Sequence, residues 1–90
     1  MLVLRQDNCG FVDLNIVPSV RTFAYYSDGE LRGKIVAESN NDSFWLGSYS
    51  SPEKADAVFM QIYEAKKAGV KDFVMPQDNR VCTNPDYCDI

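Results

Sequence analysis

The segment from Ser51 to Gly69 carries the marks of a capped amphipathic helix and constrains the fold most. Ser51 supplies a hydroxyl acceptor at the N-cap, and Pro52 stands at the first helical position, where a missing N–H costs nothing. Gly69 follows two lysines and one alanine, as is common where helices end. One helical face carries the apolar residues Ala55, Val58, Phe59, Ile62, Ala65 and Ala68. The pattern predicts a helix over about residues 52–68 that covers a core.

Short runs of strand-forming residues precede this helix at intervals of about ten residues, and one more run follows it. The Asp28-Gly29 pair predicts a hairpin turn, and Gly33 marks a place for a bulge. Because the links are short, neighbouring strands are expected to be antiparallel. The expected strands cover about residues 2–4, 11–17, 20–26, 31–37, 44–49 and 71–75.

These elements predict an α+β fold in the order β-β-β-β-β-α-β, with one antiparallel sheet of five to six strands and the helix packed on one sheet face. The whole chain, residues 1–90, is expected to form a single domain. Residues 77–90 are polar and rich in turn-forming residues, which predicts a mobile tail or one that contacts another subunit. The expected core is Val3, Val12, Leu14, Ile16, Phe23, Ile35, Leu46, Ala55, Val58, Phe59, Ile62 and Val74.

Charge and hydropathy limit the function classes. The formal net charge is −4, which argues against direct, sequence-independent binding to DNA or RNA because phosphate neutralisation needs a basic surface. No apolar run reaches the roughly 20 residues of a membrane span, and the first residues do not form a signal peptide. The expected location is therefore the cytoplasm, without membrane contact.

The chain has few of the residue types that usually catalyse reactions or bind metals. The chain has no histidine, and its three cysteines lack the CxxC spacing of zinc or redox sites. Cys9, Cys82 and Cys88 are expected to be free thiols, with a Cys82–Cys88 pair as the alternative. We expect no metal, no cofactor and no enzymatic activity.

Arginines and aromatic rings are the candidate binding groups. A guanidinium pairs well with phosphate, and a ring stacks on a nucleobase. The chain has four arginines, Arg5, Arg21, Arg32 and Arg80. If two or more of them converge with Phe73, Tyr25 or Trp45, a nucleotide site results; the alternative is scattered surface ion pairs with the acidic residues. Aromatic residues left over on the face that the helix does not cover also predict a homo-oligomer. The predicted ligand-binding set is Arg5, Arg21, Tyr25, Phe73, Arg80 and Asn84.

Four short motifs resemble the outline of a widespread set of small proteins from Gram-positive bacteria and phages. That outline has an SQD-like turn, an LGxY strand, an AxxVxxxI helix and a closing FxMP strand. An arginine, Arg5, stands before the glutamine where many members have a serine. The matching residues are Gln6-Asp7, Leu46-Gly47-Tyr49, Ala55-Val58-Ile62 and Phe73-Met75-Pro76, which span most of residues 1–78.

In this outline the chain is similar to the phage anti-defence sponges of the Thoeris system. The resemblance implies a small oligomeric protein that sequesters a cyclic ADP-ribose isomer or a cyclic oligonucleotide without cleaving it. The alternative is an inhibitor that binds a protein of a bacterial defence system, as anti-CRISPR proteins do, with an acidic surface that imitates nucleic acid. The two hypotheses differ in the surface they need: arginines around a ligand site, or acidic residues clustered on one face.

Overall fold

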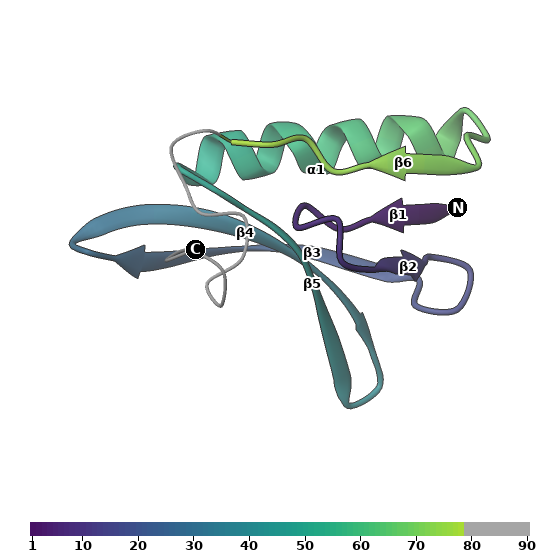
Figure 1. The fold of residues 1–90 in the computed structure, drawn as a ribbon, viewed down its shortest axis with the longest axis horizontal. Helices are drawn as coiled ribbons and strands as arrows, with labels where there is room; N and C mark the ends of the chain where they lie inside the picture. Colours follow the sequence, from purple (N-terminus) through teal and green to yellow (C-terminus); the bar gives the residue numbers. More distant parts are fainter. Residues whose placement is uncertain (79–90) are drawn as a thin grey trace.

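The computed structural model describes residues 1–78 of the 90-residue chain and shows an α+β fold (Figure 1). Helix α1 follows the first five strands and precedes the sixth, so the predicted fold class and element order are confirmed. The elements are β1 (Leu2–Leu4), β2 (Phe11–Asp13), β3 (Ser19–Ser27), β4 (Glu30–Ser39), β5 (Asp42–Tyr49), α1 (Pro52–Lys67) and β6 (Asp72–Val74).

The strands form two three-stranded sheets, which corrects the prediction of a single antiparallel sheet. One sheet has the order β2-β1-β6 and the other the order β3-β4-β5. Strand β6 runs parallel to β1, with Val3 opposite Phe73. A parallel pair needs a long crossover, and α1 together with the second sheet provides one. The short links correctly predicted the antiparallel pairs β1–β2, β3–β4 and β4–β5. They did not indicate which strand β6 pairs with.

The separation of the sheets begins where β2 ends. The strand predicted over residues 11–17 stops at Asp13, whose carboxylate accepts from the Asn15 N–H and whose carbonyl accepts from the N–H groups of Ile16 and Val17. The turn exposes Ile16, which was predicted to be in the core, and buries Val17 instead. A side-chain hydrogen bond to the backbone thus replaces strand pairing here.

The core lies between α1 and the two sheets. Predicted members such as Val3, Leu14 and Ile35 are buried, whereas Val74 is 61% exposed and its neighbour Met75 is buried. Phe23, also predicted in the core, is only partly buried. The buried cluster consists of Val3, Val12, Leu14, Val17, Ile35, Ala37, Leu46, Tyr49, Ala55, Val58, Ile62 and Met75.

Helix α1 has the predicted bounds to within one residue. The Ser51 hydroxyl accepts from the Lys54 N–H at 3.2 Å, and the chain leaves the helix through Ala68 and through Gly69, whose φ is +79°. Within residues 1–78, no helix combines the length and apolarity that a membrane crossing requires.

Gly33 of β4 lets the start of α1 approach the sheet closely. A Cβ on Gly33 would lie 2.6 Å from the Ala55 Cβ and 2.8 Å from the Pro52 Cα. The predicted bulge at Gly33 is wrong, because the irregularity lies between Ile35 and Val36, opposite the extra residue Leu46 of β5. The glycine is required by helix-to-strand packing instead.

Gly33→Ala is expected to destabilise the fold by about 2–4 kcal/mol, because the added methyl group overlaps backbone atoms that cannot move independently. Urea denaturation of the wild type and the variant measures the change in unfolding free energy, provided that the two proteins have the same m-value. Gly10→Ala is the control, since its Cβ would meet only the Arg5 side chain at ordinary distances of 3.6 and 3.7 Å. Equal stability of the two variants would contradict the packing account.

Candidate functional site

The β3-β4-β5 sheet has one face against α1 and one face away from it. Ile35 and Ala37 of β4 lie in the core, so the alternating residues Lys34 and Val36 point to the opposite face. The strand register extends that outer face across β3 and β5. With Arg5 from the β1–β2 turn, it carries the residues that we call the basic aromatic face: Arg5, Arg21, Phe23, Tyr25, Arg32, Lys34 and Trp45.

Cations and rings are stacked against one another along β3 and β4. The Arg21 guanidinium carbon lies 4.8 Å from the Phe23 ring centroid. The Lys34 Nζ lies 5.9 Å from the Phe23 ring and 5.7 Å from the Tyr25 ring. At exposed sites each such contact contributes about 0.5–1 kcal/mol. The contacts hold two positive charges and two rings together on one surface.

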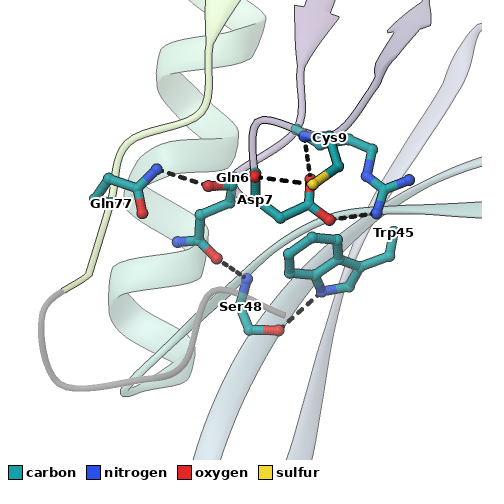
Figure 2. Close-up of polar contacts among 7 residues, drawn as sticks. Gln6, Asp7, Cys9, Trp45, Ser48 and Gln77 are labelled. Atoms are coloured by element: carbon teal, nitrogen blue, oxygen red, sulfur yellow. Dashed lines mark hydrogen bonds and ion pairs between the residues drawn. The ribbon is translucent and has the colours of Figure 1, made fainter. Parts of the chain in front are cut away.

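A further cation reaches this face from the other sheet. Arg5 lies over the Trp45 ring at 5.5 Å and forms an ion pair with Asp7. The Trp45 indole donates to the Ser48 hydroxyl at 2.9 Å (Figure 2), which orients the ring. Because Trp45 and Arg21 are both opposite Val36 in the register, the Arg5–Trp45 pair continues the row of cations and rings across the sheet.

The cations on this face differ in how fully they are neutralised. Arg21 pairs with Glu38 at 3.5 Å and Arg32 with Glu30 at 3.6 Å, both partly or largely exposed contacts of the kind that contributes little to stability. Within residues 1–78, Lys34 forms no ion pair. Lys34 is therefore the positive charge that an external anion can engage without displacing a carboxylate.

The structure brings together part of the predicted ligand-binding set. Arg5, Arg21 and Tyr25 all lie on the basic aromatic face. Phe73 does not: it lies in β6 beside Val3 and packs against the core. Two further members of the set, Arg80 and Asn84, and the proposed Cys82–Cys88 pair lie outside the described residues, as does most of the predicted tail.

Sequence reasoning missed Lys34, although a signal for it was present. Lys34 and Arg32 alternate with the apolar residues of β4, and the Asp28-Gly29 hairpin sets them directly opposite Phe23 and Tyr25. Both glycine and aspartate of the turn have positive φ, as the tight hairpin requires. Extending the predicted hairpin residue by residue would have placed Lys34 between the two rings.

Three of the four motifs, all but the helix motif, contribute to one largely buried hydrogen-bonded cluster. We call it the Gln6 clasp: Gln6, Leu46, Ser48, Tyr49, Pro76 and Gln77. The Gln6 side chain is buried; its amide nitrogen donates to the Pro76 carbonyl at 3.0 Å and its oxygen accepts from the Ser48 N–H at 2.8 Å. The Gln6 backbone N–H donates to the Leu46 carbonyl. The Gln6 carbonyl accepts from the Gln77 side chain (Figure 2). The clasp ties the two sheets and the segment after β6 together.

Tyr49 and Asp78 extend the clasp toward the start of α1. The buried Tyr49 hydroxyl donates to the Pro76 carbonyl at 2.8 Å. Burial, and secondarily the negative charge of Asp78, raise the pKa of Tyr49, so the phenol stays protonated. Asp78 itself accepts from the Ser50 N–H at 2.8 Å and lies 3.8 Å from the Lys54 ammonium. Gln77 and Asp78, the first residues of the predicted tail, are thus fastened to the domain.

Three hollows on the surface lie away from the basic aromatic face. They measure about 530, 470 and 170 Å³, and α1 contributes to the wall of each. None of these three is lined by a residue of the basic aromatic face. Within residues 1–78, no three potential metal ligands are grouped together. The groups that the structure gathers are those that hold anions and planar rings.

Gln6→Met is expected to cost about 2–5 kcal/mol of unfolding free energy, because it keeps the side-chain volume but leaves the Ser48 N–H and the Pro76 carbonyl less well satisfied. Chemical denaturation measures the loss. Gln61→Met, at an exposed position of α1, is the matched control and should change stability by no more than about 0.5 kcal/mol. A loss in Gln6→Met no larger than in the control would refute a structural role for the amide.

Tyr49→Phe tests the buried phenol by its pH dependence. A raised folded-state pKa means that the unfolded chain loses this proton first, so stability falls as pH rises above about 10. The variant should be about 1 kcal/mol less stable at neutral pH and should lose stability less steeply above pH 10. Denaturation at a series of pH values gives both quantities; parallel curves for the two proteins would show that Tyr49 does not contribute.

Comparison of the chain with protein families, with curated proteins and with solved structures found no match in any of the three.

Proposed function

We propose that this protein binds and sequesters a cyclic nucleotide immune signal, either a cyclic ADP-ribose isomer or a cyclic oligonucleotide, without cleaving it. The observation that carries the proposal is the basic aromatic face, on which cations and rings alternate in a chain of net charge −4. The resemblance to the phage anti-defence sponges supports the same function. The protein would then act in the cytoplasm of the host bacterium.

The chemistry of such a ligand matches the groups on this face. Phosphates accept charge-assisted hydrogen bonds from Lys34 and Arg21. Nucleobases stack on exposed rings with about 1–3 kcal/mol per base, and Phe23 and Tyr25 lie beside those cations. A ligand with both phosphates and bases can use both kinds of contact at once. These residues hold a ligand; none of them is arranged as a nucleophile with a general base.

The alternative, a protein-binding inhibitor that imitates nucleic acid, needs acidic residues gathered on one surface. The exposed side of α1 instead interleaves both signs of charge, and Lys67 pairs there with Glu64 at 3.9 Å. Helix α1 therefore does not supply the acidic surface that the inhibitor needs. The charged residues of the helix are Glu53, Lys54, Asp56, Glu64, Lys66 and Lys67.

Isothermal titration calorimetry and thermal shift against cyclic ADP-ribose isomers and cyclic di- and trinucleotides test the proposal directly. We expect one ligand class to bind and to raise the melting temperature. Heat denaturation of the complex should then release the ligand intact, as chromatography with mass spectrometry can verify. Recovery of a hydrolysed ligand would show an enzyme, and no binding across the panel would favour the protein-binding inhibitor.

Lys34→Gln locates the site. Removing the charge that lies between the two rings should weaken ligand binding about tenfold or more, because a hydrogen bond to a charged group is lost. Lys67→Gln is the matched control, since Lys67 also lies over a tyrosine, Tyr63, at 5.4 Å but on α1. The control should bind as the wild type does. Equal affinities for all three proteins would place the site elsewhere.

A further inference from the structure

The outer edge of β3 is long and open. Strand β3 has nine residues and pairs with β4 on one side, and no described residue pairs with its other side. It contains no proline, and its pairing with β4 has no bulge. An edge of this length and composition presents a row of free N–H and C=O groups that can pair with another strand.

The other sheet edges are short or occupied. Strands β2 and β6, the edges of the second sheet, have three residues each. The edge of β5 is engaged by Gln6, which bonds to the Leu46 carbonyl and the Ser48 N–H. Asp78 engages the next outward group, the Ser50 N–H. Among the edges described, β3 is the longest one that no described strand or side chain pairs with.

The sequence of β3 is self-complementary in an antiparallel arrangement centred on its middle residue. With a two-fold axis at Phe23, no like charges face each other, and Arg21 lies opposite Tyr25 of the partner subunit, a favourable cation–ring pair. The two strands then pair over their full length. The pairs are Ser19 with Ser27, Val20 with Tyr26, Arg21 with Tyr25, Thr22 with Ala24, and Phe23 with its own copy.

We propose that two copies of this chain associate through antiparallel pairing of their β3 strands, with the two-fold axis at Phe23. The pairing joins two three-stranded sheets into a continuous six-stranded sheet. The basic aromatic faces of the two copies become one surface, on which Arg21 of each copy adjoins a ring of the other. This association follows from the strand edge and does not depend on a ligand.

Disulfide trapping tests the register. Cys9, Cys82 and Cys88 are first replaced by serine, and Phe23→Cys or Tyr26→Cys is then introduced separately. Phe23→Cys should form a covalent dimer rapidly under mild oxidation, because the axis brings the two thiols together. Tyr26→Cys is the control, since Tyr26 is highly exposed but is opposite Val20 of the partner subunit. Equal trapping of both variants, or trapping of neither, would overturn the proposed register.

Sedimentation equilibrium without ligand tests the association itself. The wild type should be a dimer that dissociates on dilution. Phe23→Glu gains an opposite charge within its own chain, because Phe23 is opposite Lys34, but places two carboxylates at the axis. It should associate about fivefold or more weakly than the uncharged control Phe23→Gln. A monomeric wild type, or equal association of the two variants, would refute β3 pairing, whereas the ligand proposal would be judged by the calorimetry alone.

Discussion

The structure depends most on the side-chain amide of Gln6. This group is almost completely buried, yet its nitrogen and its oxygen each have a backbone partner, on the segment after β6 and on β5 respectively. A buried amide stabilises a fold only when its hydrogen bonds are made, so its two partners are held at fixed positions. One side chain thereby sets how the two sheets lie relative to each other.

The irregularity in β5 is part of the same arrangement. Leu46 is an extra residue in the ladder with β4, and its carbonyl is the acceptor for the Gln6 backbone. The bulge thus lies where β5 bonds to the β1–β2 turn. That turn also carries Arg5, whose guanidinium reaches Trp45 on the outer face of the sheet. Arg5, which precedes Gln6 in the sequence, therefore contributes to the candidate binding surface. The Gln6 clasp and the basic aromatic face are thus joined through two consecutive residues of the chain.

The candidate binding surface, the basic aromatic face, lies on one face of the β3-β4-β5 sheet. Helix α1 covers one side of the β3-β4-β5 sheet, and cations and rings cover the other. Surface arginines paired with carboxylates contribute little to folding, and Lys34 contributes its charge to no ion pair within residues 1–78. These cations therefore contribute little to the free energy of folding. They can pair with an anionic ligand at little loss of stability.

Local pattern in the sequence determined the helix, its caps, the β3–β4 hairpin and the order of the elements, because capping, turn residues and periodicity act over a few residues. Tertiary structure alone decided the split into two sheets, the parallel return of β6 and the end of β2 at Asp13. It also decided the site: Arg5 and Arg21 are sixteen positions apart, and Phe73 packs against the core although it is an aromatic residue like Tyr25. Strand register and buried hydrogen bonds between distant segments decide which side chains meet across strands. These long-range pairings produce no periodic pattern in the amino-acid sequence.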